Sequence, residues 1–326
     1  MSRRKRVFSG MQPTGEAHLG NLVGALHNWV RMQDEYETIY CVVDLHAMTT
    51  PYEPSQLERD RRDLARMIIA SGVDPGRSLL YYQSQVPQHL ELAWILGTLT
   101  GLGQLERMTQ FKEKADRAGQ NLGLLSYPVL QAADILVHKV HAVPVGDDQA
   151  QHLELTRDLA QRFNSRFGDE FPIPDRITPE IGARVMSLTD PGTKMSKSDP
   201  SPRSRILLMD PADDVVKKVK AAVTDPGTEV EYDWESKPGI SNLLELFSFF
   251  SGSPIPGLAD EYRTAGYGRF KQAVADAIVE GLRPIQEAYA GLTDSEVEAV
   301  MEKSAAIARE RADDEMRSVR ERIGIL

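Results

Sequence analysis

The sequence is poor in the residues that build disulfide frameworks and metal sites. It contains one cysteine, Cys41, so no disulfide can form within the chain and a cysteine-rich metal site is excluded. Its seven histidines include no H-x-x-x-H pair of the kind that binds zinc. We therefore expect a protein of a reducing, cytoplasmic compartment with no resident metal.

Long apolar runs are also missing. No stretch approaches the ~20 residues needed to cross a bilayer. The basic start, residues 3–6, leads directly into a strand-like segment without the apolar core of a secretory signal. The net charge of −10 argues against indiscriminate nucleic-acid binding. We expect no membrane partner, whereas binding of a nucleic acid through a local basic stripe stays open.

The 326 residues are 41% apolar, enough for one large or two moderate domains. Through about residue 190, strand-like runs alternate with segments of helical periodicity, which predicts βαβ units and a parallel, doubly wound sheet. We expect strands at 6–12, 38–44, 78–83, 143–145 and 183–188, and helices at 21–36, 55–71, 88–114 and from 147 onward.

The chain after about residue 202 is expected to be entirely helical. Asp210 and Pro211 resemble an N-cap followed by proline at the first helical position, and Thr293 with Glu296 has the spacing of a capping box. Helices are expected at about 210–223, 240–251, 267–281 and 293–322.

The first strand-to-helix junction, residues 10–21, is rich in glycine. It matches neither the dinucleotide fingerprint nor the P-loop. Gly15 permits close backbone approach, and the helix that opens at Gly20 presents amides that favour an anion. His18 and Asn21, three residues apart, are candidate hydrogen-bond donors beside this turn. A plain turn with a satisfied surface histidine explains the same residues equally well.

A second candidate, residues 194–198, places Lys194 and Lys197 three residues apart in a hydroxyl-rich loop. Alone, such a pair is more often a solvated basic linker. It gains meaning only beside a phosphate-binding turn such as the one above.

Together these stretches resemble a known family. Residues 18–21, His-Leu-Gly-Asn, are similar to the HIGH signature of class I aminoacyl-tRNA synthetases, and residues 194–198 match their KMSKS signature. Asn21 replaces the second histidine of the first signature. Further segments resemble the bacterial-type tryptophanyl-tRNA synthetases of subclass Ic, and the resemblance spans essentially the whole chain: residues 8–15, 106–114, 132–136, 143–149, 182–187 and 237–244.

The resemblance implies an activity and a domain plan. The family activates L-tryptophan with ATP to the adenylate, releases pyrophosphate, and transfers tryptophan to the 3′ end of tRNA(Trp) as a homodimer. Residues 1–192 would form a Rossmann-like, HUP-type catalytic domain, 193–201 the KMSKS loop, and 202–326 a helical anticodon-binding domain whose last helix can pack back on the catalytic domain. The dimer face could come from an apolar helical stretch that could equally be core: Leu92, Trp94, Ile95, Leu99 and Leu102.

The chemistry fits the residues. The carboxylate that attacks ATP is already ionised at neutral pH, so no general base is needed. The residues must instead position the substrates and stabilise the negative charge on the phosphates. The resemblance implies catalytic roles for Lys194, Lys197, Ser196, Gln12 and Lys114, the last of which is as easily a solvated lysine. It implies Mg²⁺ as the counter-ion of ATP, and contacts to ATP from Gln12, Pro13, Thr14, His18, Gly20, Asn21, Gly146, Asp147, Asp148, Val185, Lys194, Met195, Ser196, Lys197 and Ser198.

Recognition of an indole requires a hydrogen-bond acceptor among apolar walls. Asp134 lies in the apolar segment 132–136, and its residues alone fit a paired structural carboxylate equally well. The resemblance makes it the acceptor for the indole N–H. Its implied neighbours are Phe8, Val143 and Val145 as walls, His46 against the indole, Gln131 where many relatives carry methionine, Tyr127 and Gln149 for the amino group, and Gln12 for the carboxylate.

Three rival functions stay open. A tyrosyl-tRNA synthetase shares both signatures but needs a pocket that reads a hydroxyl. A small-molecule nucleotidyltransferase of the pantothenate synthetase kind shares the turn and loop but leaves the helical region unexplained. A regulator that binds tryptophan or tRNA has no need of Lys194 and Lys197. For the tRNA partner, the sequence offers a basic patch that is also a normal solvated helix face: Arg203, Arg205, Lys217, Lys218 and Lys220.

Overall fold

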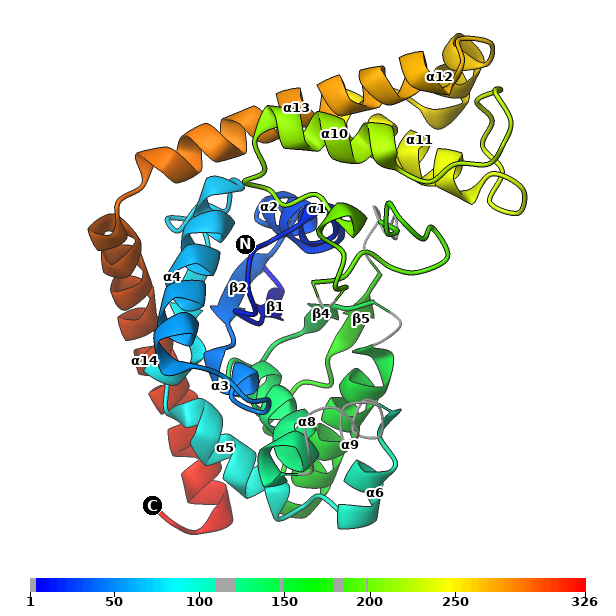
Figure 1. The fold of residues 1–326 in the computed structure, drawn as a ribbon. Coiled ribbons are helices and arrows are strands. Elements are labelled where there is room, and N and C mark those ends of the chain that lie inside the picture. The colour runs from blue at the N-terminus through cyan, green and yellow to red at the C-terminus, as the bar shows by residue number, and fades with distance from the viewer. Residues whose placement is uncertain (1–3, 110–120, 147–148, 179–184, 198) are drawn as a thin grey trace.

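The computed structural model describes residues 4–109, 121–146, 149–178, 185–197 and 199–326 (Figure 1). Five parallel strands form one sheet in the order β3-β2-β1-β4-β5. They are β1 (Arg6–Met11), β2 (Glu37–Val42), β3 (Leu79–Tyr82), β4 (Ala142–Pro144) and β5 (Asp175–Ile177). The predicted parallel, doubly wound sheet is confirmed.

The fifth strand was predicted at the wrong place. The edge of the sheet is β5, where Ala142 pairs with Asp175 and Pro144 with Ile177. In the described part of the expected strand 183–188, only Met186 is bridged, in isolation, to Lys194. The strand β5 has only three residues, of which Asp175 and Arg176 are exposed and Ile177 is half-buried, so it is too short to show an apolar alternation that a sequence pattern could detect.

Alternating side chains on the strands divide most of the interior between two large cores. Tyr40 and Val42 of β2 join one core with helix α4 (Pro54–Ala70). Ile39 and Cys41 join the other. This second core also takes in helices α5 (Gln88–Gly97), α6 (Leu102–Glu106), α8 (Leu122–Leu136) and α9 (Ala150–Phe167). The period of two in β2 therefore sets which helices cover each face.

The helix expected at 21–36 is built from three pieces. Helix α1 (Leu19–Asn21) leads into a π-helical turn, Leu22–Leu26, and then into α2 (His27–Met32). A short helix that the pattern did not predict, α3 (Asp44–Ala47), follows β2. Local π-helical geometry is rare and recurs at functional sites. Its position directly after residues 18–21 makes this strand-to-helix junction a candidate functional site.

The helical region comprises α10 (Ala212–Ala221), α11 (Pro238–Ser251), α12 (Ile255–Tyr262), α13 (Tyr267–Gly291) and α14 (Asp294–Ile323). The Thr293 capping box is confirmed. The predicted N-cap at Asp210 is wrong, because Pro211 takes that position and the Asp210 carboxylate instead accepts from the Leu207 amide at 2.8 Å and from Lys218. Helix α12 was not predicted.

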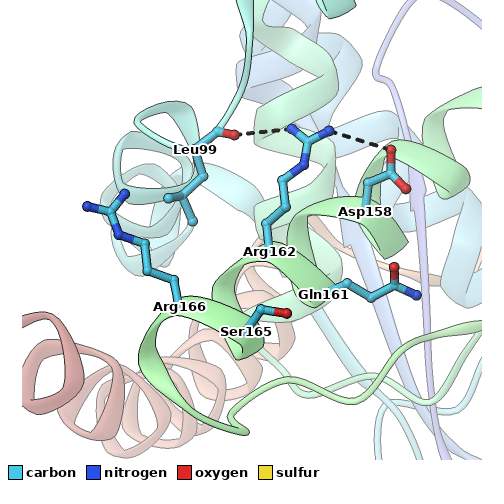
Figure 2. A pocket seen from close by; sticks show the side chains of 6 residues that line it. All are labelled: Leu99, Asp158, Gln161, Arg162, Ser165 and Arg166. Atoms are coloured by element: carbon cyan, nitrogen blue, oxygen red, sulfur yellow. Dashed lines mark hydrogen bonds and ion pairs between the residues drawn. The ribbon is translucent and has the colours of Figure 1, made fainter.

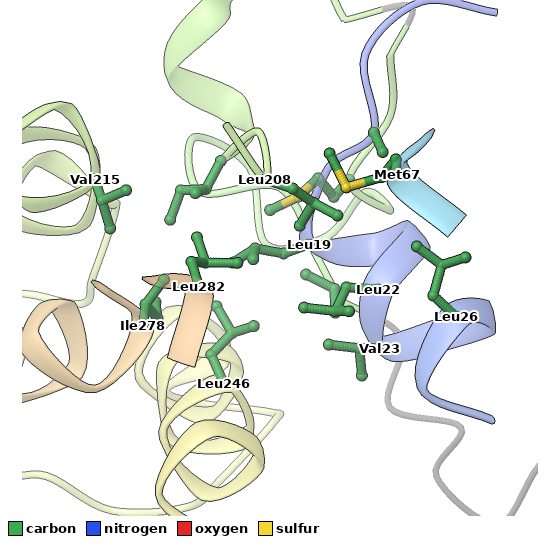
Figure 3. Packing of buried hydrophobic residues seen from close by; sticks show 14 of the residues in the cluster. Leu19, Leu22, Val23, Leu26, Met67, Leu208, Val215, Leu246, Ile278 and Leu282 are labelled. Atoms are coloured by element: carbon green, nitrogen blue, oxygen red, sulfur yellow. The ribbon is translucent and has the colours of Figure 1, made fainter. Parts of the chain in front are cut away.

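The helical region is packed onto the sheet region at two places. Leu19, Leu22, Val23 and Leu26, which follow the first signature, share a core with Leu246 of α11 and with Ile278 and Leu282 of α13 (Figure 3). Helix α14 runs back along α4 and α5 (Figure 1). Ion pairs join α14 to the sheet region, from Arg320 to Glu91 of α5 and from Arg311 to Glu37 of β2. Within the described ranges, none of the helices combines the length and apolar character needed to span a bilayer.

Candidate active site

The strand order reverses between β1 and β4, and β1 carries the glycine-rich turn at its carboxyl end. Ligands of doubly wound sheets bind at such a switch point. Gly15 adopts a φ of +72°, which favours glycine. The Asp60 carboxylate of α4 accepts from the Gly15 amide at 3.1 Å. This hydrogen bond ties the turn at the carboxyl end of β1 to helix α4.

His18 and Asn21 act as a reciprocal cap on α1. The Gly20 amide donates to His18 Nδ1 at 3.0 Å, and the His18 amide donates to Asn21 Oδ1 at 3.1 Å. Burial lowers the pKa of His18 to about 4, with smaller contributions from the charges of Lys197, Arg205 and Lys194. The ring is thus neutral at pH 7. Because Nδ1 accepts, the proton resides on Nε2, which is left as a donor.

The lysine loop reaches the glycine turn. Lys197 Nζ donates to the Gly15 carbonyl oxygen at 2.9 Å, across 182 residues of sequence. After the loop, Leu207 pairs with His18 in an antiparallel bridge. Burial lowers the pKa of Lys197 to about 8, although the carboxylates of Asp60 and Glu16 oppose this shift. Two stretches that are weak signals separately are therefore in direct contact.

The other residues expected around ATP are distributed as follows. Gln12, Pro13 and Thr14 form the turn after β1, where the Thr14 amide donates to the Gln12 carbonyl at 3.0 Å. Gly146 follows β4, the strand beside β1. Val185 and Met195 are buried and joined by a backbone hydrogen bond of 2.9 Å. Lys114, Asp147, Asp148 and Ser198 lie outside the described residues.

Asp134 of α8 is buried, with 1% of its surface exposed, and is surrounded by donors. His46 Nε2 lies 2.8 Å from Oδ2, while Gln83 Nε2 and His89 Nδ1 each lie 2.7 Å from Oδ1. Burial alone would raise the pKa of Asp134, but the hydrogen bond from His46 and the adjacent His89 ring outweigh burial and hold that pKa well below its usual range. The carboxylate is therefore ionised and fixed in orientation.

Other residues expected to bind the amino acid lie around this carboxylate. The rings of His46 and Tyr127 meet edge to face, with centroids 6.2 Å apart. The Tyr127 hydroxyl lies 3.0 Å from His152 Nε2, and Gln149 Oε1 lies 2.9 Å from His152 Nδ1. Gln131 Nε2 approaches the same Gln149 oxygen at 3.5 Å. Three apolar residues expected as walls are buried on neighbouring strands: Phe8 lies on β1, Val143 on β4, and Val145 directly after β4.

Sequence reasoning missed a chain of buried groups behind Asp134. From His89 the chain continues through the Tyr81 hydroxyl, 3.0 Å from His89 Nε2, to His138 Nε2 at 2.6 Å. Burial lowers the pKa of His138 well below its ordinary value, so its ring is neutral. Gln83 follows β3 directly, and a polar residue at that end of a strand is a signal that could have been used.

Two of the hollows in the described structure are lined mainly by residues outside this site. An apolar groove of about 670 Å³ runs between α3, α5, α6 and α8 and reaches Tyr127. A cleft of about 520 Å³ between α9 and the turn after α5 contains none of the predicted site residues (Figure 2). There Arg162 donates to the Leu99 carbonyl and faces Asp158. The second cleft is thus a surface ion-pair region.

Comparison with known proteins agrees with this geometry. The family model of tRNA synthetases class I (W and Y) matches residues 1–283. The tryptophan–tRNA ligase of Caldanaerobacter subterraneus is 46% identical over 323 residues, covering 99% of this chain and 99% of that protein. The tryptophan–tRNA ligase of Bacillus anthracis is 47% identical over 321 residues, covering 98% of both.

Solved structures of similar proteins superpose over nearly the whole chain. Tryptophanyl-tRNA synthetase from Mycoplasma pneumoniae gives a TM-score of 0.89 at 32% identity and covers 98% of each chain. The enzyme from Campylobacter jejuni, complexed with ADP and tryptophan, gives a TM-score of 0.85 at 33% identity and covers 98% of this chain and 99% of that one. The sequence, the fold and the contact between the two signatures lead to one conclusion: this chain belongs to the class I tRNA synthetases of the W and Y family.

Proposed function

We propose that this chain has tryptophan–tRNA ligase activity. It activates L-tryptophan with ATP to tryptophanyl-adenylate and pyrophosphate, and then transfers tryptophan to the 3′ end of tRNA(Trp) in the cytoplasm. The observation that carries the proposal is the contact between Lys197 Nζ and the Gly15 carbonyl, because it brings a cationic loop onto the glycine turn at the switch point of the sheet.

The first step needs charge stabilisation rather than proton transfer. The tryptophan carboxylate attacks the α-phosphate in its ionised form, and pyrophosphate leaves with the negative charge. Lys194 and Lys197 neutralise that charge, with Ser196 and Lys114 as further donors to the phosphates. His18 contributes a neutral Nε2–H donor, since the Gly20 amide occupies Nδ1. Gln12 at the end of β1 orients the carboxylate.

The ATP site follows from the strand ends. Backbone and side chains of Gln12, Pro13, Thr14, Gly20 and Asn21 contact the nucleotide at the first turn. Further contacts are proposed for Gly146, Asp147, Asp148 and Val185. Met195 and Ser198 complete the loop contacts. Mg²⁺ enters with ATP, held mainly by the phosphate oxygens.

Asp134 retains one acceptor position for the indole. An ionised carboxylate has about four lone-pair sites, and His46, Gln83 and His89 approach three of them. The indole N–H takes the fourth, between walls formed by Phe8, Val143 and Val145. Tyr127 and Gln149 hold the amino group, and Gln131 lines the same side. A substrate without the N–H leaves one acceptor position of the buried carboxylate without a hydrogen bond. The free-energy cost of this unsatisfied acceptor lowers the affinity for such substrates relative to tryptophan.

An ATP–pyrophosphate exchange assay across all twenty amino acids tests the proposal. We expect exchange that depends on tryptophan and is far slower with tyrosine or phenylalanine. Exchange driven by tyrosine alone would assign the chain to the other branch of its family. Absence of exchange with every amino acid, in protein that still binds tryptophan, would favour a regulatory binding protein.

The helical region is the proposed tRNA-binding part, with residues 202–326 as the anticodon-binding domain and α14 packed on the catalytic domain of residues 1–192. Its cationic side chains are partly paired: Lys217 with Asp214, and Lys218 with Asp210. Arg205 donates to the Asp199 carbonyl beside the loop of residues 193–201. Binding through such a patch weakens steeply with salt, since phosphates release counter-ions.

A homodimer is the proposed assembly, with a second copy seated in the apolar groove of α5, α6 and α8. Leu92 and Ile95, expected as dimer or core residues, are core. Trp94 and Leu102 are instead 79% and 61% exposed, and Leu122 beside them is 77% exposed. An apolar cluster of this kind typically marks an interface.

Replacing Trp94 by aspartate is expected to convert the dimer to monomers, because burying an unpaired charge in an apolar interface is costly. Sedimentation velocity at micromolar concentration should show twice the 36.3 kDa of one chain for the parent protein and a single-chain mass for the variant. Ile325→Asp, which adds the same charge at an exposed residue near the C-terminus, should stay dimeric. A single-chain mass for the parent would refute the assembly.

A further inference from the structure

The stem of the lysine loop is a small two-stranded hairpin. The Ser187 amide donates to the Thr193 carbonyl, and the Met195 amide donates to the Val185 carbonyl, both at 2.9 Å. Met186 and Lys194 face each other as a bridged pair between these bonds. In an antiparallel pair of this kind, the N–H and C=O of Met186 point away from its partner strand. They need another partner, because the segment is partly buried.

Asn242 supplies that partner from the helical region. The Met186 amide donates to Asn242 Oδ1 at 3.0 Å, and Asn242 Nδ2 donates to the Met186 carbonyl at 3.1 Å. One side-chain amide therefore replaces a third strand. Asn242 is 2% exposed and lies in the first turns of α11.

The base of α11 is itself tightly fixed. A side chain at Gly239 would lie 2.1 Å from the Val223 carbonyl oxygen, so only glycine allows this approach of α11 to the end of α10. The Val223 amide in turn donates to the Leu188 carbonyl, in the hairpin turn, at 2.8 Å. The hairpin is thus held at its turn by Val223 and at its stem by Asn242.

We infer that Asn242 is a positioning residue for the activation step, which fixes Lys194 and Lys197 against the phosphates through the main chain of Met186. The inference rests on the proposed function. Met186 lies opposite Lys194, and Lys197 follows three residues later on the Gly15 carbonyl. Since a displacement of about 1 Å at a reacting centre can cost about 100-fold in rate, a lost stem anchor should act on turnover.

Asn242→Ala is expected to lower kcat for tryptophan-dependent pyrophosphate exchange by about 10- to 100-fold, with the KM for tryptophan unchanged. Ser241→Ala is the matched control. Ser241 is equally buried in the same turn of α11, and its hydroxyl accepts from the Asp233 amide rather than from the hairpin. Its exchange rate should stay within about two-fold of the parent protein.

Hydrogen–deuterium exchange gives a readout that does not depend on catalysis. Peptides within residues 185–197 should exchange faster in Asn242→Ala than in Ser241→Ala, whereas peptides from β1 should be unchanged. Asn242→Ser, which is too short to reach both Met186 groups, should behave like the alanine variant and decides the matter if that variant does not fold. Equal loop exchange in all variants, or an equal loss of kcat in Ser241→Ala, would overturn the inference. If the parent protein had no pyrophosphate-exchange activity, the proposed function would be refuted. Hydrogen–deuterium exchange of residues 185–197 would still show whether Asn242 stabilises the hairpin.

Discussion

Replacing Lys197 by alanine is expected to lower the rate of tryptophan-dependent ATP–pyrophosphate exchange by about 10²- to 10³-fold, the loss typical of removing one preorganised donor to transition-state charge. Lys197 donates to the carbonyl of the Gly15 turn, and its proposed role is to neutralise charge on the leaving pyrophosphate. Tryptophan binding, measured by calorimetry without ATP, should be unchanged because the proposed indole contact is made by Asp134 and not by the loop.

The control for this variant is Lys303→Ala, which removes an exposed lysine from α14. Its exchange rate should match that of the parent protein. If Lys197→Ala also retained the parent rate, the loop would have no catalytic role in activation. If both tryptophan affinity and exchange fell together, a structural role for the loop would explain the result better.

The same lysine predicts a pH dependence. Burial lowers the pKa of Lys197 to about 8, and the protonated form is the one that attracts phosphate. The value of kcat/KM for ATP reports the free enzyme, so it should fall as pH rises through about 8. In Lys197→Arg the guanidinium keeps its charge, and this fall should move to much higher pH. A profile unchanged by the substitution would assign the titration to another group.

The part of the site that sequence could predict is the part fixed by local connectivity. Parallel strands bring their following turns to one edge of the sheet, so the turn at Gly15 and the strand ends near Gly146 could be expected together. The sequence associates the lysine loop with the glycine-rich turn, but no local signal specifies that Lys197 Nζ meets the Gly15 carbonyl oxygen. The strand β5 was predicted at the wrong place, because two polar residues followed by Ile177 are too short a segment to show periodicity.

The anchors of the site were not predictable for a different reason. His89 reaches Asp134 because α5 packs against α8, and Asn242 reaches Met186 because Gly239 allows α11 to approach Val223. Each contact joins residues dozens of positions apart, through packing that no single segment encodes. Burial of His89 and Asn242 is also unusual for polar residues, so composition rules place them on the surface.

Replacing Asp134 by asparagine is expected to weaken tryptophan binding by about 10- to 150-fold, which corresponds to the roughly 1.5–3 kcal/mol of a hydrogen bond to a charged group. Asparagine keeps the volume of the side chain but loses the charge, and its amide nitrogen confronts donors from His46, Gln83 or His89. Calorimetric titration with tryptophan measures the change. An unaltered affinity for tryptophan would contradict the proposed hydrogen bond between Asp134 and the indole N–H.

A structural role for Asp134 would also weaken binding, so the ligand has to be varied as well. β-(3-Benzothienyl)alanine has nearly the shape of tryptophan but carries sulfur in place of the indole N–H. The parent protein should bind it more weakly than tryptophan, because Asp134 then lacks its donor. In Asp134→Asn that preference should largely disappear. Equal losses for both ligands would show that Asp134 acts only through the fold.

Stability separates the two roles further. Removing a buried, paired carboxylate costs about 3–5 kcal/mol, so Asp134→Asn should unfold at a lower temperature even without ligand. Glu170→Gln is a matched case, because Glu170 is a buried carboxylate paired with Lys139 and Arg322. It should lose stability but keep the preference for tryptophan.

Since the pKa of Asp134 is held low by His46 and His89, its contribution to stability is present above the unfolded pKa of about 4 and is lost as pH falls below it. Burial alone would raise the pKa of Glu170, but hydrogen bonds from Lys139 and Ser318 outweigh burial and hold that pKa low as well. Both substitutions should therefore lose part of the acid sensitivity, whereas only Asp134→Asn should lose the indole preference.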